Sequence, residues 1–66
     1  MSNTPRALVT GARRGIGRAI AVELAGAGFG LVLTDILEDA ELAETRRLCE
    51  TLGAQVATRR LDVNDV

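Results

Sequence analysis

The stretch TGARRGIG, residues 10–17, follows directly on the apolar run ALV at residues 7–9. A short apolar run closed by glycines favours a buried strand over residues 6–10 that ends in a tight turn. Beyond the turn, an alanine-rich segment predicts a helix over about residues 15–25. The apolar residues at helical spacing on one face of this helix are Ile16, Ile20, Leu24 and Ala27.

Downstream of this helix the chain alternates strand and helix patterns. Residues 29–34 (FGLVLT) form a continuous apolar run, as in parallel strands that are buried on both faces. Residues 38–52 predict a helix with an acidic first turn, and residues 55–61 predict a third strand. The apolar stripe of the second helix is Leu42, Leu48, Cys49 and Leu52. Strands separated by helices pair in parallel through right-handed crossovers, which predicts the α/β class.

The glycines of the first turn indicate an anion site. A helix start carries backbone N–H groups without partners, and these bind phosphate where side chains leave room. We expect Gly11 to turn the chain out of the strand, Gly15 to let a pyrophosphate approach, and Gly17 to let the helix pack closely on the sheet. Arg13 and Arg14 lie on the same loop near that charge, or are solvated loop residues.

Two aspartates end the second and third predicted strands. Asp35 lies eighteen residues beyond Gly17, near the offset at which an acidic side chain accepts hydrogen bonds from an adenosine ribose. Alternatively, Asp35 caps the next turn. Asp62 has the alternative role of capping a following helix. Ligands of open parallel sheets bind at the carboxyl ends of the strands, where Gly11, Asp35 and Asp62 all lie.

Composition narrows the class of protein. The 66 residues carry a net charge of −1 and one aromatic residue, Phe29, so we expect neither nucleic-acid binding nor attraction to a membrane surface. One cysteine and no histidine exclude an internal disulfide and a Cys/His zinc cluster, and Cys49 is expected to be a small core residue. No apolar stretch reaches the length of a membrane span or a signal-peptide core, which favours a cytoplasmic protein.

The motif resembles the start of the short-chain dehydrogenase/reductase family. Residues 10–17 fit the family's Thr-Gly-x-x-x-Gly-Ile-Gly pattern, Asp35 matches its acidic ribose-binding position, and Asp62-Val63 match its adenine-contacting pair. The similarity spans essentially the whole chain and is nearest to bacterial enzymes named 3-oxoacyl-carrier-protein reductases. Motif and resemblance together indicate these cofactor-binding residues: Gly11, Arg13, Arg14, Gly15, Ile16, Gly17, Asp35, Ile36, Asp62 and Val63.

The resemblance implies a Rossmann-type, doubly wound parallel sheet and hydride transfer between a nicotinamide and an alcohol or carbonyl substrate. The family's catalytic Ser, Asn and Tyr-x-x-x-Lys lie further downstream, and this chain has no tyrosine and no lysine. We therefore expect residues 1–66 to form the incomplete N-terminal half of the domain, without catalytic residues, in an enzyme that forms tetramers or dimers. The alternatives are a non-catalytic dinucleotide-binding or regulatory relative and a fragment that needs another chain to fold.

Asp35 favours NAD over NADP. Its carboxylate would accept hydrogen bonds from free ribose hydroxyls, whereas a 2′-phosphate at about 4 Å would be repelled by about 4 kcal/mol at an effective dielectric of about 20. Against this, Arg14 precedes the second glycine, where a basic residue accompanies NADP preference in the family. Arg14 has two other predicted positions, paired with Asp35 or along the pyrophosphate. Because Ile36 supplies no second arginine, NAD is the expected cofactor and NADP the less favoured one.

Overall fold

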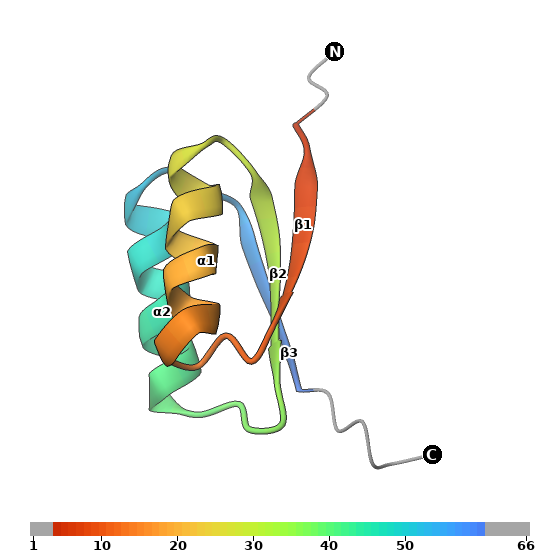
Figure 1. Ribbon diagram of the computed structural model, residues 1–66, viewed down its shortest axis with the longest axis vertical. Coiled ribbons are helices and arrows are strands. Elements are labelled where there is room, and N and C mark those ends of the chain that lie inside the picture. Colours follow the sequence, from red (N-terminus) through yellow and green to blue (C-terminus); the bar gives the residue numbers. More distant parts are fainter. Residues whose placement is uncertain (1–3, 61–66) are drawn as a thin grey trace.

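The computed structural model describes residues 4–60, which form a three-stranded parallel sheet with two helices (Figure 1). The elements are β1 (Arg6–Thr10), α1 (Gly15–Gly26), β2 (Gly30–Asp35), α2 (Ala40–Thr51) and β3 (Val56–Arg60). The α/β class and the order of the elements are confirmed, and the bounds differ from the expected ones only at element ends. The expected end of the third strand at residue 61 lies outside the described residues.

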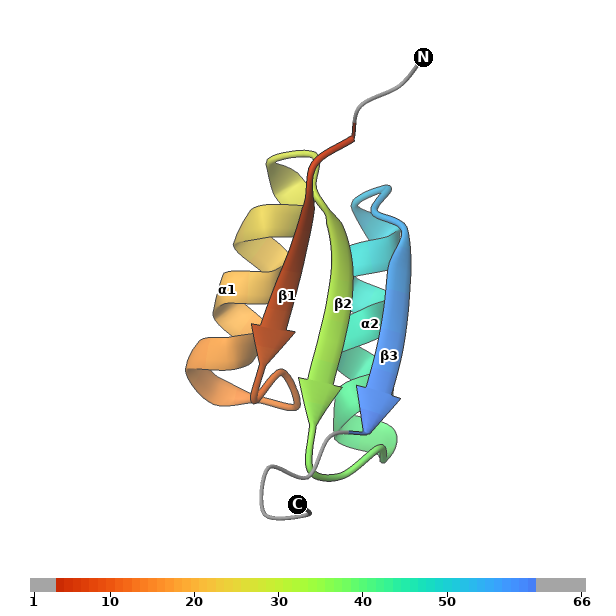
Figure 2. The same cartoon turned by 90° about the vertical axis from the view of Figure 1, so that its right-hand side faces the viewer.

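The sheet has the order β1-β2-β3, with β2 in the centre (Figure 2). Both pairs are parallel, and Leu8, Val32 and Ala57 are aligned across the three strands. Because both crossovers step across the sheet in the same direction, right-handed connections place both helices on the same face (Figure 1). A doubly wound sheet adds its second helical layer through crossovers in the opposite direction, and none occurs within residues 4–60.

The two faces of the sheet differ accordingly. Leu31 and Leu33 of β2 are buried in the core that the helices cover. On the other face Val32 is half-buried and Leu8 is 63% exposed. The expectation that β2 is buried on both faces is therefore met on the face that the helices cover and only in part on the other face.

The core face of α1 was predicted correctly only for Leu24, which packs against the core, and wrongly for Ile16, Ile20 and Ala27. Ala21 and Ala25 are buried against the sheet, whereas Ile16 and Ile20 are 80% and 47% exposed. The reason lies at the start of the helix, where the backbone of Gly17 approaches the preceding loop so closely that a Cβ there would collide with it. At this close approach the methyl groups of Ala21 and Ala25 fill the core, and the larger Val22 and Leu24 pack half-buried beside them.

The buried stripe of α2 is mostly as expected. Leu42 and Cys49 are buried, which confirms Cys49 as a core residue, and burial raises the pKa of its thiol. Leu52 is instead 51% exposed, and the fully buried Thr45 lies on the stripe between Leu42 and Cys49. The helix begins after Asp39, whose carboxylate accepts hydrogen bonds from the N–H groups of Glu41 and Leu42.

Candidate functional site

The loop from β1 to α1 turns on two glycines in the left-handed conformation. Gly11 and Gly15 both have φ +64°, which L side chains rarely adopt. A Cβ at either residue would meet nothing within 4 Å, so the space beside both backbones is open. Gly11 thus makes the predicted turn out of β1, and the approach to Gly15 is clear.

Gly17 is a glycine for a different reason. A Cβ on Gly17 would collide with the carbonyl oxygen of Gly11 and lie 3.2 Å from the Cα of Ala12. Both neighbours are backbone atoms and cannot rotate away. The predicted close packing of Gly17 is present, but its partner is the loop itself and not a strand.

The start of α1 presents uncapped backbone amides. Arg14 is the N-cap residue, its side chain makes no capping hydrogen bond, and the first turn holds no acidic residue. The first amide of the helix with a partner is that of Arg18, which donates to the carbonyl of Arg14 at 3.4 Å. Within residues 4–60, the N–H groups of Gly15, Ile16 and Gly17 have no acceptor. Such a helix start binds anions through its amides and its dipole.

The two loop arginines differ in their partners. Nε and Nη2 of Arg13 donate to the carboxylate of Asp39 at 2.6–3.1 Å. This hydrogen bonding is the main cause that lowers the pKa of Asp39 to about 2, and it raises the pKa of Arg13. Arg14, by contrast, is exposed and its guanidinium has no partner in the described part of the chain. Arg14 is therefore the loop arginine that is available to a ligand.

Asp35 lies directly beside this loop. Its Oδ2 accepts a hydrogen bond from the backbone N–H of Arg13 at 3.2 Å, and its Oδ1 accepts one from the N–H of Ile36 at 2.7 Å. The second bond is the turn-capping role considered for Asp35. A carboxylate offers about four acceptor positions, so the half-buried Asp35 retains capacity for further donors. Within the described residues Arg14 does not pair with Asp35.

A buried network that sequence reasoning missed holds the loop against α2. The hydroxyl of Thr45 donates to the carbonyl of Ala12 at 2.7 Å and accepts from Nε of Arg18 at 2.9 Å. Nη2 of Arg18 also donates to the carbonyls of Arg13 at 2.6 Å and Glu41 at 2.8 Å. With the loop carbonyls bound in this way, the loop's position relative to α2 is fixed. Thr45 could have been found from its spacing, three residues after Leu42 on the buried stripe.

The carboxyl ends of β1 and β2 thus bring together Gly11, Gly15, Gly17, Arg13 and Asp35, with Arg14, Ile16 and Ile36 exposed around them. Asp62 and Val63, the predicted adenine contacts, lie outside the described residues. Residues 4–60 contain no cluster of side chains suited to a metal ion. Neither helix there is long and apolar enough to cross a membrane.

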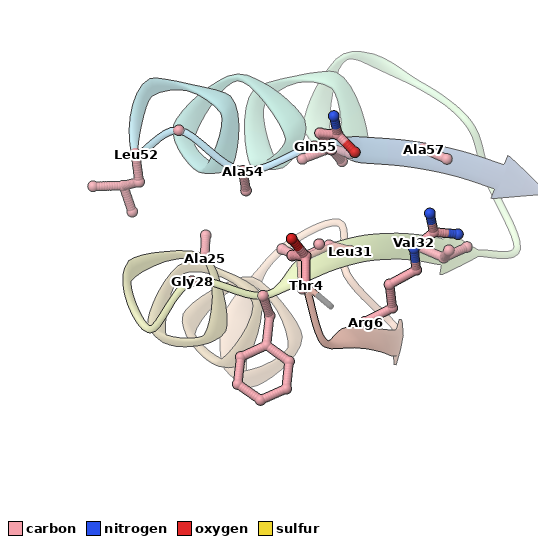
Figure 3. Close-up of a pocket in the computed structure, with 14 residues that line it drawn as sticks. Thr4, Arg6, Ala25, Gly28, Leu31, Val32, Leu52, Ala54, Gln55 and Ala57 are labelled. Atoms are coloured by element: carbon pink, nitrogen blue, oxygen red, sulfur yellow. The ribbon is translucent and has the colours of Figure 1, made fainter. Parts of the chain in front are cut away.

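A hollow of about 680 Å³ lies at the opposite end of the sheet (Figure 3). The α1–β2 turn and β2 line one side, and the α2–β3 turn and β3 line the other. Arg6 is the single charged side chain among the residues that line it. The hollow therefore lacks the converging polar groups that mark the loop end of the sheet.

Comparison with known proteins places this geometry in a family. The family model described as short chain dehydrogenase matches residues 5–66. SadH of Mycobacterium tuberculosis is 51% identical over 57 residues, which cover 86% of this chain and 20% of SadH. This chain thus spans about a fifth of the length of that relative.

Solved structures agree with the family match. Acetoin dehydrogenase YohF from Salmonella typhimurium superimposes with a TM-score of 0.90 at 32% identity, over 96% of this chain and 25% of YohF. Carveol dehydrogenase from Mycobacterium avium, solved in complex with NAD, superimposes with a TM-score of 0.84 at 33% identity, over 92% of this chain and 26% of that protein.

Proposed function

This chain belongs to the short-chain dehydrogenase family, and from that membership we propose that its β1–α1 loop binds the diphosphate of a nicotinamide dinucleotide. The observation that carries the proposal is the row of uncapped amides at Gly15, Ile16 and Gly17, next to an open approach over Gly15. These amides donate to the phosphate oxygens, and the free guanidinium of Arg14 adds positive charge.

We propose NAD as the preferred cofactor and NADP as the less favoured one. Asp35 keeps acceptor capacity for two ribose hydroxyls, and its negative charge opposes a 2′-phosphate. Ile36, 53% exposed, covers the adenosine side without offering a cation. The NAD complex of the carveol dehydrogenase named above supports this choice by analogy. Asp62 and Val63 are proposed to contact adenine.

For the whole protein we propose an oxidoreductase that transfers hydride between the nicotinamide and an alcohol or carbonyl substrate. Residues 1–66 then supply the cofactor-binding, N-terminal half of the Rossmann domain. The acetoin and carveol dehydrogenases among the relatives act, by their names, on small alcohols, which supports this substrate class. A 3-oxoacyl-carrier-protein substrate and a tetrameric or dimeric assembly stay predictions from the resemblance, and a cytoplasmic location stays a prediction from the sequence.

Calorimetric titration of the purified protein with NADH and NADPH tests the cofactor site. We expect tighter binding of NADH, and we expect Asp35→Ser to shift the preference toward NADPH because it removes the opposing charge. Glu23→Gln, which neutralises an exposed acid on α1, is the control and leaves the preference unchanged. If the protein binds neither NADH nor NADPH, the proposal is contradicted.

A dinucleotide-binding module without catalysis is the second candidate. It rests on the same row of uncapped amides, which binds a dinucleotide with or without a following reaction. Both candidates bind the cofactor, so alcohol-dependent reduction of NAD by the purified protein separates them.

A further inference from the structure

Arg13 connects the proposed ribose site to the start of α2. Its backbone N–H donates to Asp35, the proposed ribose-binding carboxylate, at 3.2 Å. Its guanidinium extends to the next helix, where Nη2 lies 2.6 Å from the carboxylate of Asp39 and Nε donates to both Asp39 oxygens at 3.1 Å. One residue thus links the acid that selects the cofactor with a second acid four positions later.

Asp39 is itself fixed. As the N-cap of α2, its carboxylate accepts hydrogen bonds from the N–H groups of Glu41 at 3.1 Å and Leu42 at 3.3 Å. The low pKa of Asp39, about 2, keeps it charged throughout the neutral range. The guanidinium of Arg13 is therefore bound to a rigid, permanently charged partner, and its side chain is only 17% exposed.

This arrangement bears on cofactor choice because a 2′-phosphate needs a cation. Enzymes that accept NADP place an arginine near the ribose, where it accommodates the phosphate. In this chain the arginine next to Asp35 already donates from Nε and Nη2 to a carboxylate, which offsets its charge and holds the guanidinium away from the ribose-binding acid. Other charges near Asp35 are Arg14 of the loop, Arg60, which is aligned with Asp35 on β3 and donates its Nε to the carbonyl of Ile36 at 3.2 Å, and Glu41, which pairs with Arg18 at 3.5 Å.

We propose that Asp39 is a specificity-determining residue that acts through Arg13. By holding the Arg13 guanidinium at the start of α2, Asp39 withholds it from a 2′-phosphate and so maintains the preference for NAD that Asp35 establishes. This inference rests on the proposed cofactor site. It assigns a function to an ion pair that would otherwise only join the loop to α2.

Asp39→Asn tests this directly, because asparagine caps helices as well as aspartate does but carries no charge. We expect the ratio of the NADH to the NADPH affinity, measured by calorimetry on the purified protein, to fall about fivefold, the scale of a released partly exposed ion pair. The double variant Asp39→Asn/Arg13→Gln returns the ratio to the wild-type value, because the released cation is then absent. Asp39→Ser, also a good cap, repeats the comparison if the asparagine variant folds poorly.

Glu44→Gln is the matched control. It removes an acid of the same helix that pairs with Arg47 and, within residues 4–60, makes no hydrogen bond or ion pair with the loop, so the ratio stays at the wild-type value. An unchanged ratio in the Asp39 variants, or equal weakening of both cofactors, overturns the specificity role while NADH binding by the wild type still supports the proposed function. A fall in the ratio that persists in the double variant also overturns it, because Arg13 would not be the released cation. If the wild type binds neither dinucleotide, the proposed function itself fails.

Discussion

Gly17 and Gly26, two glycines of the same helix, are predicted to respond to alanine in opposite directions. At Gly17 the added methyl collides with the carbonyl oxygen of Gly11 and lies 3.2 Å from the Cα of Ala12. At Gly26 the methyl meets nothing within 4 Å, and the backbone is not in the left-handed region. The two substitutions are chemically identical, so their difference isolates the close approach of α1 to the loop.

The magnitudes follow from these surroundings. Methyl groups forced into closely packed structure cost about 1–3 kcal/mol, and here the obstacle is backbone on both sides, so Gly17→Ala belongs at the upper end. Gly26→Ala removes chain entropy from the unfolded state and gains about 0.5–1 kcal/mol. We therefore expect the free energies of unfolding of the two variants to differ by about 3 kcal/mol or more.

Urea unfolding of the purified variants, followed by circular dichroism, measures this difference, and calorimetry with NADH measures its effect on the site. Gly17→Ala is expected to lose NADH affinity because relief of the collision displaces the amides at the helix start. Gly26→Ala keeps wild-type affinity, since it lies at the far end of the helix. If the two variants have equal free energies of unfolding, the close approach at Gly17 is refuted. If their NADH affinities are equal as well, the geometry of the loop does not determine binding.

Three further predictions concern buried and paired groups. Thr45→Val leaves the carbonyl of Ala12 without its hydroxyl donor and should lower the free energy of unfolding by about 1–3 kcal/mol in a urea titration, whereas Thr45→Ser, which keeps the hydroxyl, should cost less. The folded-state pKa of Asp39, about 2, is below its ordinary value of 3.8. The charged carboxylate therefore contributes its full stabilisation above about pH 4 and loses it as the pH falls through 2. The urea midpoints of the wild type and Asp39→Asn should converge at that low pH. Cys49, fully buried with a raised thiol pKa, should resist a thiol reagent in native buffer and react at once in denaturant, and rapid native labelling would contradict its burial.

The parts of the fold that were predictable depend on local chemistry. Gly11 and Gly15 indicate a left-handed backbone, because glycine adopts it without strain. The apolar run before them is nearly sufficient to predict β1. Asp35 was placed correctly because parallel strands end at a common edge, so its position along the sequence fixes its position in space. These inferences needed no knowledge of how α2 packs.

The pairings of Arg13, Arg18 and Thr45 were not predictable in the same way. Arg13 and Asp39 are separated by 26 residues, and Arg18 and Thr45 by 27. Whether they meet depends on the rotation and height of α2 relative to the loop, which tertiary packing sets. An arginine next to glycines is equally compatible with a phosphate and with a distant carboxylate, so the sequence could not divide the roles of Arg13 and Arg14.

The error about the face of α1 has a more general cause. Amphipathic reasoning assigns the largest apolar residues to the core, yet the buried residues of α1 are Ala21 and Ala25, in line with Gly17 at spacings of four. Of the predicted residues Leu24 packs against the core, and the isoleucines are exposed. Gly17 lets the backbone of α1 approach the loop, and the methyl groups of Ala21 and Ala25 continue the same line of the helix into the core. The close approach at the anion site and the alanine core thus lie along one line of α1. In a helix that follows a glycine-rich turn, the stripe of small residues in line with the last glycine is therefore the better prediction of the core face.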